Sequence, residues 1–107
     1  MKITNFATAP LRDNPFNADV RILFTREDIE FLTLKLKPQQ NLEVVRINCD
    51  AFFYVVNGNP EVIINEEKYK AQINDFIFCP VGSNHCINNP NDDYSLVIVI
   101  KLTQKLI

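Results

Sequence analysis

One short segment, residues 74–89, constrains the fold of this chain more than any other, because it combines an apolar run, turn residues and the single histidine of the sequence. Pro80 ends the apolar run, since proline has no backbone N–H to donate to a neighbouring strand. Gly82 favours a tight reversal through its freedom to adopt a positive φ. His85 then begins the next apolar run. The segment predicts a strand, a tight turn and a second strand that carries the histidine.

Short runs rich in Val, Ile, Leu and Phe follow one another along most of the chain, separated by turn residues. In residues 29–36, Leu32 and Leu34 share one face while Thr33 and Lys35 share the other, which is the period of a half-buried strand. No segment keeps a helical period. The predicted strands are residues 20–24, 29–36, 42–47, 51–56, 61–64, 68–73, 75–79, 85–88 and 94–102. This regular rhythm favours an all-β fold, an antiparallel β-barrel or jelly roll.

A length of 107 residues accommodates one domain and leaves no room for a second. Residues 1–19 carry Pro10 and Pro15 among several Asn and Asp residues, a composition typical of an extended arm. Residues 20–103 hold all the predicted strands, and residues 104–107 remain as a short tail. The expected organisation is an N-terminal arm, one β-barrel domain and a C-terminal tail.

Charge and hydropathy narrow the classes of partner. The formal net charge is −2, which argues against binding to nucleic acid or to an anionic membrane surface. No segment approaches the roughly 20 apolar residues of a membrane span, and residues 1–10 lack the apolar core of a signal peptide. The three cysteines, Cys49, Cys79 and Cys86, form no Cys-x-x-Cys pair and are expected to be reduced. We therefore expect a cytoplasmic protein whose partner is a small molecule or another protein.

The spacing of Pro80, Gly82, His85 and Asn89 resembles the second motif of the cupin family, G-x5-P-x-G-x2-H-x3-N. Asn74 stands where that motif has its first glycine, and asparagine also tolerates left-handed backbone geometry. The resemblance implies a cupin β-barrel over roughly residues 32–102. It also implies that the histidine points into the barrel, where the family's histidine binds a divalent metal.

The first cupin motif supplies two more histidines and a glutamate, and Gly58 corresponds to its last glycine. Counting back from Gly58, the glutamate position falls on Ala51. The histidine positions fall on one of two pairs, depending on whether the spacer has three or four residues: Val45 and Ile47, or Val44 and Arg46. With either spacer, the resemblance implies a cupin barrel that lacks three of the four usual metal ligands.

Three side chains are candidates for contact with a ligand: His85, Phe53 and Cys49. His85 is either a neutral histidine hydrogen-bonded in a polar corner or a ligand-contacting group, and it is also the one weak candidate for a metal ligand. Phe53 shares a face with Ala51 and either floors an apolar pocket or fills the core. Cys49 would face the same cavity as His85 if the strand from Val45 continued regularly. We expect no metal to be bound, because one imidazole does not hold a divalent ion.

The last predicted strand is apolar on both faces over residues 95–101, so its second face needs a cover. Either the N-terminal arm or a second copy of the chain supplies this cover. Symmetric pairs are the commonest oligomers, and we predict a homodimer through the C-terminal strand.

Three functions agree with these observations. The leading one is a metal-independent barrel without a cofactor that binds a small molecule, as a sensor or an accessory subunit. The second is a metal-dependent cupin enzyme, of the dioxygenase or sugar-phosphate isomerase type, with one divalent metal held by His85 and further ligands. The third is a dimeric interaction module without a ligand. The fold by itself does not decide among them.

Overall fold

A computed structural model describes residues 1–103, which form nine β-strands and no helix. The strands are β1 (Asp19–Arg26), β2 (Ile29–Leu36), β3 (Val45–Arg46), β4 (Asp50–Asn57), β5 (Glu61–Ile64), β6 (Glu67–Lys70), β7 (Phe76–Cys79), β8 (Asn84–Asn88) and β9 (Ser95–Leu102). No helix that could cross a membrane is found in this part of the chain. The tail expected at residues 104–107 lies outside the described residues.

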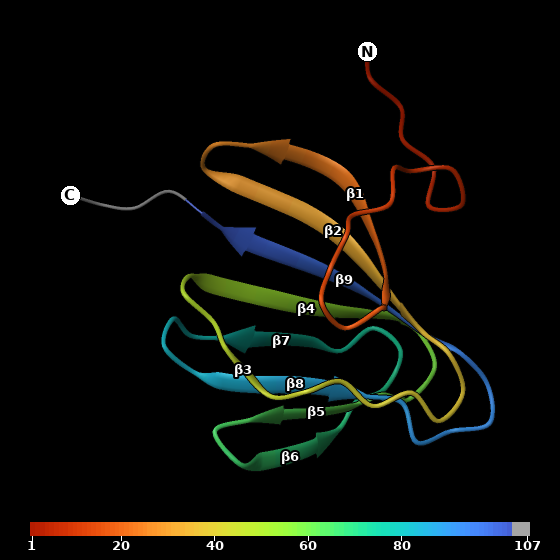
Figure 1. The fold of residues 1–107 in the computed structure, drawn as a ribbon, viewed down its shortest axis with the longest axis vertical. Coiled ribbons are helices and arrows are strands. Elements are labelled where there is room, and N and C mark those ends of the chain that lie inside the picture. Colours follow the sequence, from red (N-terminus) through yellow and green to blue (C-terminus); the bar gives the residue numbers. More distant parts are fainter. Residues whose placement is uncertain (104–107) are drawn as a thin grey trace.

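The strands form two antiparallel sheets (Figure 1). One sheet has the order β1-β2-β9-β4-β7, and the other has the order β3-β8-β5-β6. Strands far apart in sequence are neighbours, since β9 lies between β2 and β4 and β8 lies between β3 and β5. The prediction of an all-β antiparallel jelly roll is confirmed.

The core lies between the two sheets and follows the alternation predicted from the sequence. The inward residues of β2, β4 and β9 are buried: Leu32, Leu34, Leu36, Ala51, Phe53, Val55, Val97 and Val99. Val62 of β5 and Ile87 of β8 close the core from the other sheet. Each large apolar side chain buried in this way stabilises the fold by about 1.5–3 kcal/mol.

The segment of residues 74–89 forms the predicted strand, turn and strand. Asn74 has a φ of 75° and Gly82 a φ of 85°, so both adopt the left-handed conformation expected at these positions. The turn between β7 and β8 closes with a hydrogen bond of 3.1 Å from Ser83 N to Pro80 O. The Asn89 amide is fully buried and donates hydrogen bonds to the carbonyl oxygens of residues 36, 37 and 93. Asn89 thereby joins the end of β8 to the loops around it.

Two predicted strands are shorter than expected by two or more residues. The strand predicted at residues 42–47 is reduced to Val45–Arg46, because the Asn88 side-chain oxygen accepts the hydrogen bond of Leu42 N at 3.0 Å in place of a backbone carbonyl. The strand predicted at residues 68–73 ends at Lys70. Ala71 N still donates to Pro60 O in the register of β5 and β6, but Pro60 has no backbone N–H to donate in return, so the ladder stops there.

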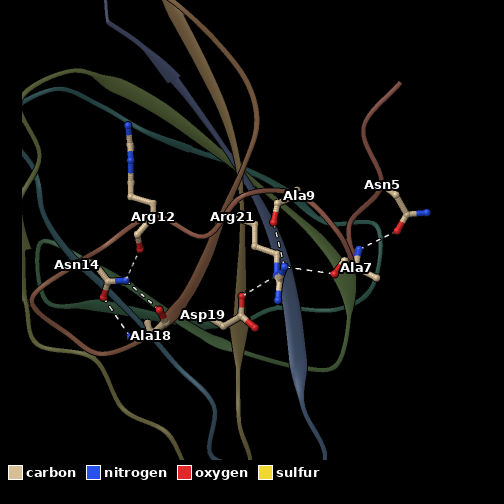
Figure 2. A network of polar contacts seen from close by, with 8 residues as sticks. All are labelled: Asn5, Ala7, Ala9, Arg12, Asn14, Ala18, Asp19 and Arg21. Atoms are coloured by element: carbon tan, nitrogen blue, oxygen red, sulfur yellow. Dashed lines mark hydrogen bonds and ion pairs between the residues drawn. The ribbon is translucent and has the colours of Figure 1, made fainter. Parts of the chain in front are cut away.

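The N-terminal arm is packed against the sheet rather than simply extended. It runs along the outer edge of β1, where Arg12 N donates to Val20 O at 2.8 Å and Ile22 N donates to Pro10 O at 2.9 Å. The Arg21 guanidinium holds the arm by donating to the carbonyl oxygens of Ala7 and Ala9 (Figure 2). This arrangement buries Ala9 and carries residues 12–18 toward the space between the sheets.

The C-terminal strand β9 is a central strand, so both of its edges are paired. Val97 and Val99 belong to its inward face and are buried in the core. Leu96, Ile98 and Ile100 alternate with them, lie on the outward face and are only half-buried. The surface that still needs a cover is therefore the outward face of β9.

A candidate ligand-binding cavity

A cavity of about 170 Å³ lies between the sheets, against the N-terminal arm. A cavity of roughly 150 Å³ with apolar walls is known to hold a benzene molecule, so this one accommodates a compact organic ligand. Most of its walls are apolar. The lining residues are Arg12, Asn14, Phe16, Ala18, Val20, Leu32, Thr33, Leu34, Leu42, Glu43, Val45, Phe53, His85, Cys86, Ile87, Val99 and Lys101.

His85 lies on β8 and forms part of the cavity wall. Its backbone pairs with Val45 of β3, and its ring Nδ1 lies 3.0 Å from the Val45 carbonyl oxygen. The ring stacks on Phe53, with 5.7 Å between ring centroids and 22° between the planes. The backbone of β3 and the ring of Phe53 therefore hold the imidazole in one orientation.

The protonation state of His85 follows from these contacts. Burial lowers its pKa below the ordinary histidine value, and the Lys101 charge lowers it further, although the hydrogen bond to Val45 acts in the opposite direction. The ring is therefore neutral near pH 7. Because a carbonyl oxygen only accepts hydrogen bonds, Nδ1 carries the proton and donates it to Val45. Nε2 is left as an acceptor for a ligand hydroxyl or amide group.

Phe53 both fills the core and lines the cavity, the two alternatives that the sequence left open. It is 1% exposed and belongs to the apolar core, and its side chain also lines the cavity beside His85. Alternation along β4 puts it on the face of Ala51, as expected, while Phe52 and Tyr54 lie on the other face. Contact of Phe53 with a ligand stays a prediction.

Cys49 is not among the residues that line the cavity. The expectation assumed a regular strand through residues 45–49, but β3 ends at Arg46 and Cys49 lies in the bend that follows. Its thiol is half-buried, and burial raises its pKa, as it does for Cys79 and Cys86. All three cysteines are free thiols that stay protonated near neutral pH.

The charged groups of the cavity were not predicted from the sequence. Lys101 lines it from β9, and Arg12 lines it from the arm. The Arg12 guanidinium forms a bidentate ion pair with Glu30 of β2, and this pair holds the pKa of the Glu30 carboxyl below its usual range. Strand alternation alone indicated where Lys101 lies, because residues 97, 99 and 101 share one face of β9 and Val97 and Val99 face inward.

Comparison with known proteins decides the family. Residues 45–101, more than half of the chain, match the family described as the cupin domain. The chain belongs to the cupin family. No curated protein matches the chain.

Solved structures agree with this cupin fold. TT1209 from Thermus thermophilus is 23% identical, with a TM-score of 0.81 over 95% of this chain and 97% of that one. An RmlC-like cupin from Shewanella frigidimarina is 13% identical, with a TM-score of 0.84 over 98% and 93% of the two chains. A predicted oxalate decarboxylase from Thermotoga maritima is 14% identical, with a TM-score of 0.82 over 94% and 98%. At these identities the similarity shows a common fold alone.

The structure also identifies the spacer of the first cupin motif. Val45 lines the cavity and Ile47 is buried, whereas Val44 and Arg46 are exposed. The three-residue spacer therefore describes this cupin, and Val45, Ile47 and Ala51 occupy the positions of the two histidines and the glutamate.

The usual cupin metal does not fit the residues at these positions. Two aliphatic side chains and a methyl group offer no donor atom, so His85 would be alone among four positions. Across residues 1–103, no three His, Cys, Asp or Glu side chains are grouped so that they could hold a metal ion. Lys101 adds a positive charge on the β9 strand beside Ala51, which would repel a cation placed there.

Proposed function

We propose that this cupin is a metal-independent binding protein that holds a small organic molecule between its sheets. The observation that carries the proposal is a cavity with apolar walls that His85 lines while its Nδ1 is engaged by the Val45 carbonyl oxygen, which leaves Nε2 as the free ring nitrogen. Small-molecule sites typically combine largely apolar walls with a few fixed polar groups of this kind. A sensor or an accessory subunit would use such a site without any chemical step.

The metal-dependent enzyme is the less favoured function, because it needs donor atoms that residues 45, 47 and 51 do not have. An enzyme of the dioxygenase or sugar-phosphate isomerase type would have to recruit ligands from elsewhere in the chain. The absence of donors at three of four positions supports binding over catalysis at this site.

The proposal is tested by a thermal-shift screen of chelator-treated protein against a metabolite library, with elemental analysis of the untreated protein. A ligand present at about 100 times its Kd stabilises the fold by about 2.7 kcal/mol, which a melting curve resolves easily. We expect such stabilisation in the wild type and its loss in His85→Ala, while the control Asn48→Ala, at an exposed position, retains it. About one equivalent of bound metal, with stabilisation only in its presence, would support the enzyme instead.

We also propose that the protein is a homodimer through the outward face of β9. The pairing registers place Phe24, Phe31, Ile100, Phe52 and Phe78 in one row across all five strands of the larger sheet. Phe24 is 39% exposed and Phe78 is 51% exposed. An apolar row of this length on an open sheet face favours burial against a second copy, because the same row on two subunits matches itself about a twofold axis.

A further inference from the structure

Two cations and one carboxylate lie close together on the side of the cavity formed by β2 and β9. Glu30 of β2 is the direct cross-strand neighbour of Lys101 of β9. Arg12 from the arm forms the bidentate ion pair with Glu30, whose side chain is 15% exposed. Within residues 1–103, no carboxylate lies within ion-pair distance of the Lys101 ammonium. One positive charge therefore remains uncompensated at the cavity wall.

The position of this charge follows from the lining of the cavity and the strand register. Lys101 lines the cavity together with His85 and lies opposite Glu30 on the neighbouring strand, and its charge lowers the pKa of both groups. Glu43 also lines the cavity, but its side chain is exposed to solvent, which screens its charge. The cavity thus combines an unpaired ammonium with the neutral Nε2 of His85.

The remaining walls determine what kind of anion would fit. Leu34, Phe53, Ile87 and Val99 supply apolar surface, and the amide of Asn14, which also lines the cavity, already donates to backbone oxygens of the arm. A phosphate carries about two charges and usually needs several donors or an arginine fork, but the Arg12 fork already binds Glu30. A carboxylate needs only one cation and leaves the rest of the ligand to the apolar walls.

We infer that the ligand of this cavity is a small apolar carboxylic acid, aromatic or branched aliphatic, whose carboxylate pairs with Lys101 while its body packs against Phe53. This inference rests on the proposed function and names the ligand class of the same site. Arg12 and Glu30 hold the arm against the cavity, and His85 Nε2 accepts a hydrogen bond from any hydroxyl group on the ligand.

The inference is tested by calorimetric titration of chelator-treated protein with benzoate and with benzamide, which have nearly the same shape and differ in charge. We expect benzoate to bind about tenfold more tightly, the size of effect that a hydrogen bond to a charged group gives. Lys101→Met should remove this preference by weakening benzoate binding alone. The control Lys35→Met removes the same charge from the outward face, where the ammonium lies 4.7 Å above the Tyr94 ring, and should keep the preference.

The outcomes separate the ligand class from the proposed function. Equal affinity for both probes in the wild type, or tighter binding of benzamide, would overturn the inference and leave small-molecule binding supported. A preference for benzoate that survives in Lys101→Met would overturn the role of Lys101. No binding of either probe at about 10 mM would count against both the inference and the proposed function.

Discussion

At the scale of single residues, His85 combines two roles that the sequence presented as alternatives. Its Nδ1 donates to the Val45 carbonyl oxygen, which is a structural contact, and its ring forms part of the cavity wall. Because Nδ1 is occupied, only Nε2 remains for a ligand. The structural contact therefore determines which atom, and which hydrogen-bonding role, the cavity offers.

The first prediction concerns the titration of His85. We expect its pKa to lie below 6.5, because burial and the Lys101 charge both disfavour the imidazolium. The unfolded chain binds this proton at about 6.5, so the free energy of unfolding is highest above that pH and falls as the pH drops toward the folded-state pKa. The Glu30 carboxyl, whose pKa is lowered by Arg12, loses its stabilising contribution only as the pH falls below the ordinary glutamate value of about 4.5.

NMR titration of the imidazole measures this pKa directly, and the single histidine makes the assignment unambiguous. Urea unfolding of wild type and His85→Asn between about pH 5 and pH 8 should show that the free energy of unfolding falls with decreasing pH in the wild type only. A ring that titrates at or above 6.5 would mean that neither burial nor Lys101 acts on it as described.

At the scale of elements, the short strand β3 and the arm decide the shape of the cavity. The two residues of β3 place Val45 opposite His85, at a position where the family has a metal ligand. The arm brings Arg12, Asn14 and Phe16 to the cavity from the other side. Neither element has the long alternation of apolar and polar residues from which a strand is predicted.

The second prediction follows from the three-residue spacer. Val45→His, Ile47→His and Ala51→Glu together should create a site for zinc, because His85 would complete four ligands on a rigid barrel. The matched control, Val44→His with Arg46→His and Ala51→Glu, puts both histidines on exposed positions and should bind no better than the wild type. Zinc titration by calorimetry compares the two, and equal affinity in both variants would mean that the spacer is assigned wrongly.

The third prediction concerns Asn14, whose side chain organises the part of the arm that lines the cavity (Figure 2). Its amide donates to Arg12 O and Ala18 O, and its oxygen accepts from Phe16 N and Ala18 N. We expect Asn14→Ala to accelerate hydrogen exchange in residues 12–18, to lower stability by about 1 kcal/mol and to weaken binding in the cavity.

Asn5→Ala is the matched control, because Asn5 accepts one hydrogen bond from Ala7 N in the arm but does not line the cavity. It should leave both exchange in residues 12–18 and binding unchanged. If Asn14→Ala behaves like this control, the arm does not shape the site.

The sequence predicted the parts of the molecule that depend on local pattern. Alternation located the inward faces of β2 and β4, and the Pro, Gly and His spacing located the turn before β8. It could not locate contacts between distant segments, such as the Arg12–Glu30 pair or the side-chain bond from Asn88 that shortens β3. Cys49 was misplaced for the same reason, because its position depended on the continuation of that strand.

At the scale of the whole molecule, the apolar outward face of the larger sheet is not explained by a single copy of the chain. Phe52 lies between Phe76 and Phe78, at 5.2 Å from each ring centroid, and both outer rings are more than half exposed. The inward face of the same sheet is closed by the core. A partner packed on the outward face would complete the burial of β9. The sequence predicted that this second face of the strand needs a cover.

The fourth prediction concerns the homodimer. Ile100→Lys should give a folded monomer, because Ile100 is in the middle of the outward apolar row and a lysine there would place a charge in the interface. Val97→Lys puts the same charge in the core, since Val97 is fully buried, and should unfold the protein instead. Light scattering with circular dichroism distinguishes the two, and a wild type that is monomeric at about 1 mM would contradict the dimer.

The central claim, that this cupin holds a small molecule between its sheets without a metal, is tested most directly by NMR titration of chelator-treated protein with benzoate and benzamide. With at least one of the probes, we expect chemical-shift changes concentrated at His85, Phe53 and Phe16, unaltered by added zinc. Changes that appear only after zinc is added, or that map to the outward sheet face, would contradict it.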